Sequence, residues 1–234
     1  MRAARSEAFP LPVRNPTLTN GRCPLRSVTR RRSTHHAVQA EATEARLLSA
    51  VTELLDAGEP FTAISVQRII DEAGVSRATF YAHFRGKSDI LARLSAQLRE
   101  SLLALARQWD PAVAEDGADR FTRFFEEVIV VHRTHRSLIT AIREVAAYDP
   151  EVSDFYTADL EGFDEHVLAT LLAEQDAGST SPDLDAVAAS RIIVWGGGQA
   201  IAHHISVDDG SGDASFAREL ARIWWYGAYR RPAE

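Results

Sequence analysis

Apolar residues recur from about residue 47 onward at spacings of three and four positions, which is the period of amphipathic helices. Neither an alternating strand pattern nor an internal repeat interrupts this period. The sequence therefore predicts an all-α protein of about nine helices. The first predicted helix ends at Gly58, and the others cover about 65–73, 76–84, 88–105, 121–129, 137–147, 151–174, 183–205 and 213–229.

Residues 64–87 have the pattern of two short helices joined by a tight turn. Ser65 and Ser76 stand where each helix needs an N-cap, and Gly74 stands where the chain must turn sharply. This arrangement is typical of a helix-turn-helix, whose second helix enters the major groove of DNA. The N-cap at Ser76 lets the first residues of that second helix face outward.

The residues of this second helix and the turn after it have side chains that suit DNA contact. An arginine can bind a guanine edge, small and methyl-bearing side chains can contact a thymine methyl, and hydroxyl, imidazole and ammonium groups can donate to phosphates. The candidates are Arg77, Ala78, Thr79, Tyr81, His83 and Lys87. The net charge of −7 does not exclude DNA binding, because residues 1–36 carry +7 and residues 37–234 carry −14.

These residues carry a resemblance to the TetR family of bacterial repressors. The matching motifs are Gly74-Val75-Ser76, Thr79-Phe80-Tyr81, His83-Phe84 and Lys87, within a likeness that covers about residues 41–93. The resemblance implies DNA contacts by Thr79, Tyr81, His83 and Lys87, with Ser65, Val66 and Gln67 beside the phosphates at the start of the supporting helix. Position 78, often proline in relatives, is alanine here, which leaves the base preference open.

The same resemblance implies a homodimer formed through the two C-terminal helices and a second domain with a pocket for a small ligand. An excess of aromatic residues supports a pocket for a hydrophobic or aromatic ligand. Residues 119–229 further resemble the subgroup that contains the mycobacterial repressor of ethionamide activation. The predicted ligand-binding residues are Phe121, Phe124, Phe125, Val128, Tyr156, Phe163, His166, Trp195 and Trp224.

Within that likeness, the amides found on the penultimate helix are replaced by Ile193 and Gly196. His166 and Arg143 are then the remaining polar candidates for ligand contact. The run Gly196-Gly197-Gly198 lies in a predicted helix, where each glycine costs about 1 kcal/mol relative to alanine. It permits either close approach of a partner helix at the dimer seam or space for a ligand beside Trp195.

The predicted organisation is a disordered basic arm at 1–38, a helix-turn-helix domain at 39–86 and a regulatory and dimerisation domain at 87–234. The run Thr29-Arg30-Arg31-Arg32 either lies along DNA or belongs to an untethered tail, or to upstream sequence from a misplaced start codon. No apolar run is long enough to cross a membrane, and the single cysteine, Cys23, favours a reducing cytoplasm.

Other chemistry has weaker support. His132 with His135, and His203 with His204, have no cysteine or suitably spaced carboxylate beside them, so no metal site and no cofactor are expected. No catalytic motif is present, so an enzyme is not expected. We therefore predict a TetR-type repressor that a small ligand releases from operator DNA. The alternatives are an activator, a repressor without a ligand, or a dimer that has lost DNA binding.

Overall fold

The computed structural model describes residues 28–109, 111 and 117–233, with side chains from Val38 onward. The chain forms two compact units, Met1–Gln39 and Ala40–Glu234. In the first unit the described part is the start of helix α1 (Val28–Asp56). Residues 28–38 are therefore helical, which corrects the disordered arm predicted for them; no proline or glycine after Pro24 interrupts the chain before Gly58. Residues 1–27, which include Cys23, and the side chains of Thr29–Arg32 lie outside the described residues.

The described residues are helical throughout, without a strand, as the hydrophobic pattern predicts. Because α8, a π-helical turn (η2) and α9 are continuous, and α10 continues into a second π-helical turn (η3), the described part contains nine uninterrupted helices. None of them is long and apolar enough to span a membrane. After α1 they are α2 (Val66–Ala73), α3 (Arg77–His83), α4 (Lys87–Gln108), α5 (Gly117–Thr134), α6 (Arg136–Ala146), α7 (Pro150–Asp176), α8–η2–α9 (Ala186–Val207) and α10–η3 (Asp213–Tyr229).

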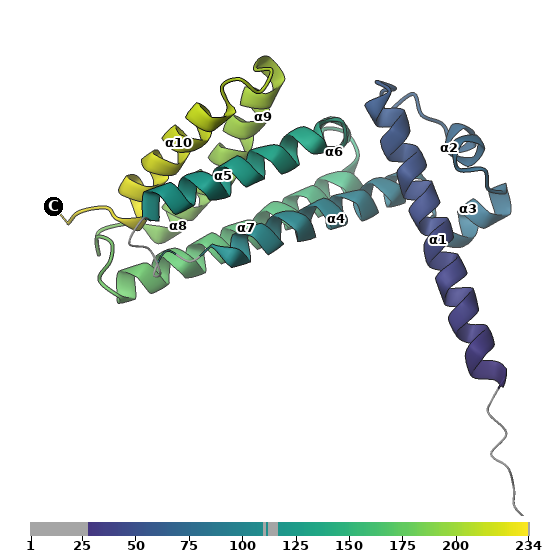
Figure 1. Cartoon of the computed structure of the whole chain (residues 1–234), viewed down its shortest axis with the longest axis horizontal. Coiled ribbons are helices and arrows are strands. Elements are labelled where there is room, and N and C mark those ends of the chain that lie inside the picture. Colours follow the sequence, from purple (N-terminus) through teal and green to yellow (C-terminus); the bar gives the residue numbers. More distant parts are fainter. Residues whose placement is uncertain (1–27, 110, 112–116, 234) are drawn as a thin grey trace, which may run out of the picture. The chain divides into compact units, whose positions relative to one another are not determined.

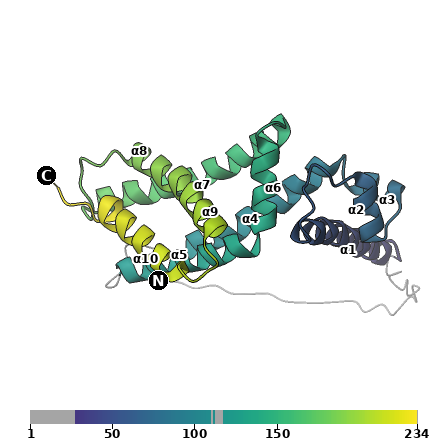
Figure 2. The same ribbon diagram turned by 90° about the horizontal axis from the view of Figure 1, so that it is seen from above.

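The second unit has two hydrophobic cores. The first is built from α1 to α4 and continues into α6 and the first turn of α7, through residues such as Leu138, Ile142 and Val152. The second joins α5, the end of α7, α8–η2–α9 and α10–η3. The long helices α4 and α7 run side by side, and α5 packs against α10 (Figures 1 and 2). The helix-turn-helix thus shares its core with the first part of the regulatory helices.

The three consecutive glycines lie where η2 passes into α9. A Cβ on Gly197 would lie 2.1 Å from the Trp224 ring, so this glycine permits close approach of α10 within the same chain. Gly198 has no atom within 4 Å of a Cβ position and lines a cavity. Gly197 therefore permits a close approach that the sequence did not predict, within one chain, and it also lines this cavity beside Gly198.

Candidate DNA-binding and ligand-binding sites

Contacts between residues that are close in the sequence hold α3 in place. Gly74 ends α2 in the left-handed conformation, with φ at 61°, which a residue with a Cβ rarely adopts. The Ser76 hydroxyl then accepts a hydrogen bond from the Thr79 backbone N–H at 3.0 Å and caps α3. Phe80, which is fully buried, anchors the inner face of the helix in the first core. The opposite face is left for recognition.

Three predicted contact residues of α3 are exposed: Arg77, Ala78 and Tyr81. The Arg77 guanidinium lies over the Tyr81 ring, 5.5 Å from its centroid, and this contact orients both side chains. Thr79 and His83 are half-buried, and the Thr79 hydroxyl shares a hydrogen bond of 2.7 Å with Ser76. The outward face of α3 therefore offers one cation and one phenol.

The three predicted residues at the start of α2 differ in accessibility. Gln67 is exposed and donates to Asp71 at 2.8 Å. Ser65 caps α2 by accepting from the Arg68 N–H at 3.1 Å. Val66 is partly buried and packs against the first core. Ser65 and Gln67 are thus exposed, whereas Val66 is partly buried.

Lys87 is placed differently from its predicted role as a phosphate donor. Its ammonium donates to the carbonyl oxygens of Phe61, Thr62 and Ile64 at 2.9, 3.2 and 3.1 Å. An ammonium has three N–H groups, so all of them are used within the protein. Burial lowers the pKa of Lys87. Its side chain thus connects the start of α4 to the loop before α2.

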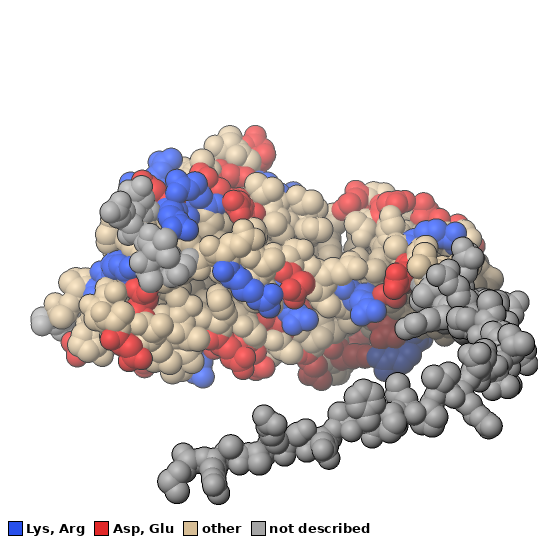
Figure 3. Space-filling view, turned by 60° about the horizontal axis from the view of Figure 1, so that its bottom comes forward, with Lys and Arg blue, Asp and Glu red and all other residues tan. Residues whose placement is uncertain are grey.

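Acidic partners also neutralise two of the basic side chains between residues 77 and 93. Arg85 pairs with Asp89 at 2.8 Å, and Arg93 pairs with Glu44 at 2.6 Å. On the face shown in Figure 3, acidic and basic side chains are interspersed over the second unit. Among residues 77–93, Arg77 is the cation without a carboxylate or carbonyl partner.

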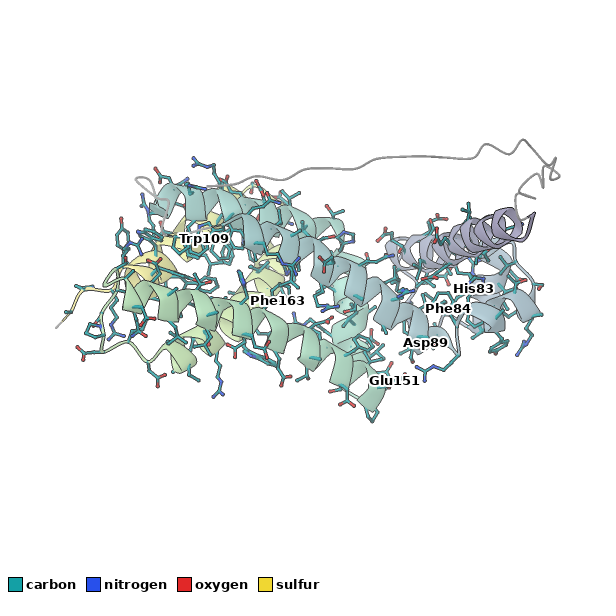
Figure 4. All side chains as sticks on the ribbon, turned by 90° about the horizontal axis from the view of Figure 1, so that it is seen from below. His83, Phe84, Asp89, Trp109, Glu151 and Phe163 are labelled. Carbon is teal, nitrogen blue, oxygen red and sulfur yellow. The ribbon has the colours of Figure 1, made fainter. Side chains whose placement is uncertain are left out.

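Arg85 also joins the helix-turn-helix to the regulatory helices. Its guanidinium reaches Glu151 in the first turn of α7 at 2.7 Å, while its backbone N–H donates to Asp89. Asp89 and Glu151 are labelled at this junction in Figure 4. Beside it, the Ser88 hydroxyl donates to Asp149, the N-cap of α7, at 3.1 Å. The end of α3 is therefore connected by polar contacts to the same turn of α7 that enters the first core.

An apolar cavity of about 180 Å³ lies within the second core; we call it the inner cavity. Trp109 at the end of α4 and Phe163 of α7 contribute to its wall (Figure 4). Seven of the nine predicted ligand-binding residues line it: Phe121, Phe124, Phe125, Val128, Phe163, His166 and Trp224. The sequence reasoning did not name as ligand-binding residues Leu102, Ala106, Trp109, His132, Leu160, Val167, Thr170, Ile193, Val194, Gly197, Gly198, Ile201 and Tyr229. Of these, Trp109 was visible in the aromatic excess, whereas the aliphatic ones resemble ordinary core residues.

Trp195 is the predicted ligand residue that lines neither this cavity nor the adjoining one described below. It is 42% exposed and lies outside the cavity wall, because Ile193 and Gly197, four positions apart, face the core and Trp195 lies on the opposite side of the helix. Trp109 stacks on Phe121 with ring centroids 4.3 Å apart, and Phe125 meets Trp224 edge to face at 5.0 Å. The cavity is thus framed by aromatic rings that hold one another in place.

A second cavity of about 100 Å³, the polar cavity, adjoins the first. The two share Leu102, His132, Leu160, Phe163 and Gly198. The polar cavity is further lined by Ser95, Leu98, Arg99, Ile139, Ile142, Arg143, Tyr156, Asp159 and Ala202, so the predicted ligand residue Tyr156 lies here and not in the inner cavity.

Two titratable groups of the polar cavity, Asp159 and His132, have shifted pKa values. Burial raises the pKa of Asp159, against the opposing effects of a hydrogen bond from Ser95 at 2.8 Å and the charge of Arg99 at 2.9 Å. Burial lowers the pKa of His132, against a hydrogen bond of 2.8 Å with the Val128 carbonyl. His132 is therefore neutral at pH 7.

One cluster of potential metal ligands was missed in the sequence. His204, Asp208 and Asp213 bring their ligand atoms within 4.8 Å of one another. The Arg133 guanidinium lies among them, with Nε and Nη2 each 2.6 Å from the Asp213 carboxylate and Nη1 2.9 Å from the Asp208 carbonyl. These carboxylates thus already have a cation, and the cluster fastens α5 to the turn between α9 and α10.

Comparison with known proteins supports the assignment of the helix-turn-helix. Residues 48–94 match the family model described as bacterial regulatory proteins, tetR family. Residues 48–94 are thus a TetR-family helix-turn-helix region. Over 190 residues the chain is 25% identical to the HTH-type transcriptional regulator UidR of Escherichia coli (strain K12), an alignment that covers 78% of this chain and 91% of UidR.

Solved structures of similar fold extend the likeness beyond the helix-turn-helix. Salmonella enterica GusR superposes with a TM-score of 0.68 at 20% identity, over 82% of this chain and 96% of GusR. The fatty acid degradation regulator FadR from Bacillus halodurans superposes with a TM-score of 0.65 at 16% identity, over 81% and 97% of the two chains. The C-terminal helices therefore share the fold of these regulators.

Proposed function

We propose that this regulator is a dimeric repressor that binds operator DNA through α3 and is released when a small apolar ligand enters the inner cavity. The observation that carries the DNA-binding part is the exposed pair of Arg77 and Tyr81 on a capped and anchored helix. Gln67 at the start of α2 would contact the adjacent phosphates. Binding to chromosomal DNA would place the protein in the cytoplasm, and no catalytic role is proposed.

Gel-shift titration with the intergenic DNA on either side of its gene tests this part. We expect Arg77→Gln with Tyr81→Ala to abolish specific binding, while Arg107→Gln, an exposed arginine at the far end of α4, retains it. Wild-type protein that binds no DNA at low salt would overturn the proposal. Transcription from the bound promoter then separates a repressor from an activator, which is the alternative reading.

Dimerisation through the C-terminal helices is supported by exposed apolar side chains. Ile223 and Tyr226 of α10–η3 are 63% and 60% exposed, and Ile192 of η2 is 66% exposed. The close approach of Gly197 to Trp224 brings these two segments beside each other. In a symmetric dimer, two such patches would cover one another and space the two copies of α3 about one DNA turn apart.

Sedimentation of Ile223→Glu tests the interface. The added charge should convert the dimer to a monomer and weaken operator binding, because each half-site would then be bound alone. Val130→Glu introduces the same charge at an exposed position of α5 and should remain dimeric. A dimer that persists in Ile223→Glu would place the interface elsewhere.

Ligand release is supported by the apolar wall of the inner cavity. It is also supported by α4 and α7, which contribute both to that wall and to the core of the helix-turn-helix. A ligand that prefers one spacing of the two α3 helices shifts the population toward it. A repressor without a ligand is the alternative. The narrower likeness to the ethionamide-repressor subgroup stays a prediction.

Calorimetric titration with 4-phenylbutan-1-ol, an apolar probe with one ring, tests the cavity. Phe125→Arg places a charge in the wall and should abolish binding, and Val194→Phe should do the same by filling the space. Val130→Arg on the exposed side of α5 is the control and should bind as wild type does. If the probe binds equally to all of these proteins, the ligand site lies elsewhere.

A further inference from the structure

Arg143 of α6 stands at the boundary between the polar cavity and the protein surface. Together with Ile139 and Ala202 it lines both that cavity and an open groove between α6 and α9, which we call the surface groove. The groove is otherwise lined by Arg136, Thr140, Glu144, Gln199, His203, Ile205 and Ser206. Groove, polar cavity and inner cavity therefore follow one another, since each shares wall residues with the next.

The positive charges of the polar cavity outnumber its negative charges. Asp159 already has two partners, Arg99 and Ser95, so its charge is satisfied inside the polar cavity. The Arg143 guanidinium donates to the side-chain carbonyl of Gln199, a neutral group, and has no carboxylate partner among the described residues. With His132 neutral, Arg99, Arg143 and Asp159 leave the polar cavity with a net charge of +1.

An uncompensated guanidinium at the mouth of an apolar cavity favours a particular kind of molecule. An arginine binds a carboxylate through two parallel N–H donors, and such charge-assisted bonds are stronger where water is partly excluded. The inner cavity is somewhat larger than the about 150 Å³ of apolar space that holds benzene. It can thus take one aromatic ring or a comparable hydrocarbon group.

We infer that the ligand of this regulator is an amphipathic carboxylate whose anionic head binds Arg143 and whose apolar body enters the inner cavity past His132 and Phe163. The inference rests on the proposed ligand-binding function of that cavity. Gln199 holds the guanidinium in place before the ligand arrives and gives way to the carboxylate. A cationic amphiphile is disfavoured because Asp159, the carboxylate within the polar cavity, is already paired.

Calorimetric titration of the purified full-length protein with 4-phenylbutanoate, 4-phenylbutan-1-ol and 4-phenylbutan-1-amine tests the inference. The three probes share one apolar body and differ in the charge of the head. We expect the acid to bind at least about tenfold more tightly than the alcohol, which matches the usual strength of a hydrogen bond to a charged group, and the amine to bind most weakly.

Substitutions at α6 identify the source of this preference. Arg143→Gln should reduce the ratio of acid to alcohol affinity to within about twofold while leaving the affinity for the alcohol unchanged, and Arg143→Lys should restore part of it. Arg136→Gln removes the same charge from the same helix at a residue that lines the groove but not the polar cavity, so it should keep the full ratio. A merely structural role of Arg143 would weaken all three probes together.

The outcomes separate this inference from the function on which it rests. Equal binding of acid and alcohol, with loss of both in Val194→Phe, would overturn the inference that the ligand has an anionic head. It would still support the inner cavity as the ligand-binding site. A preference for the acid that survives Arg143→Gln would assign the head group to another residue and also overturn the inference. Failure of all three probes to bind would overturn the inference and the proposed cavity together.

Discussion

Gly197 lies so close to Trp224 that a Cβ on the glycine would fall 2.1 Å from the indole ring. Gly197→Ala should therefore displace the ring or shift α9, at a cost of about 1–3 kcal/mol for overpacking. Gly198→Ala has the opposite expectation, since its Cβ would enter open space and alanine favours a helix by about 1 kcal/mol.

Thermal unfolding distinguishes the two neighbouring variants. We expect the midpoint of Gly197→Ala to fall and that of Gly198→Ala to stay level or rise by about 2–4 °C. A similar loss in both variants would show that helix geometry, and not the ring of Trp224, sets the requirement for glycine.

Lys87 has a structural role that can be separated from contact with DNA. Lys87→Met removes three hydrogen bonds to backbone carbonyls and should lower the free energy of unfolding by about 2 kcal/mol. Arg93→Met, which breaks one exposed ion pair, should cost less than about 1 kcal/mol. Urea titrations of both variants provide the comparison.

The salt dependence of operator binding tests whether Lys87 contacts a phosphate. Arg77→Gln removes a cation that faces the DNA, so it should reduce the slope of log K against log salt by up to about 0.9, the value for one neutralised phosphate. Lys87→Met should leave the slope as in wild type. An equal reduction in the two variants would mean that Lys87 leaves its carbonyl partners to bind a phosphate.

The buried carboxylate of Glu174 depends on Arg230. Glu174 is only 4% exposed and pairs with the Arg230 guanidinium, which also donates to the Pro111 carbonyl at 2.8 Å and covers the Trp225 ring at 4.5 Å. Arg230→Met should cost about 3–5 kcal/mol, because it leaves a buried charge alone. Adding Glu174→Met should recover most of this loss in urea denaturation; a double variant no more stable than the single one would contradict this account.

His132 should make stability depend on pH just below neutrality. Burial lowers its pKa in the folded protein, so as the pH falls below about 6.5 the unfolded chain binds a proton that the folded protein does not. Stability should therefore fall with falling pH, by up to about 1.4 kcal/mol per pH unit, until the lowered pKa is reached. His132→Asn should show a shallower slope between pH 7 and pH 5.5; an unchanged slope would exclude His132 as the source.

The helical order of the chain could be predicted from its sequence because the signals are local. Apolar spacing, the caps Ser65 and Ser76 and the turn at Gly74 each act within a few residues, and the helices begin and end close to the predicted positions. The prediction of a disordered arm was wrong for residues 28–38, where α1 begins, because polarity and basic charge do not by themselves prevent a helix.

Features set by distant residues were not predictable in the same way. The aromatic residues of the cavity wall were recognisable by type, but the exposure of Trp195 depends on which face of its helix packs against α5 and α7. The carbonyl partners of Lys87 are 23 to 26 positions away in the sequence. Similarly, Asp208 and Asp213 meet Arg133 only because the turn after α9 folds back onto α5.

The core of the DNA-binding helices does not close at the start of α4, because Leu138, Ile142 and Val152 complete it from α6 and α7. A chimera that joins α1–α3 of this chain, at residue 86, to the ligand-binding domain of another protein would thus leave an apolar surface of these helices uncovered. A functional graft has to carry α6 and the first turn of α7 along with it, so the practical module for redesign is discontinuous in sequence.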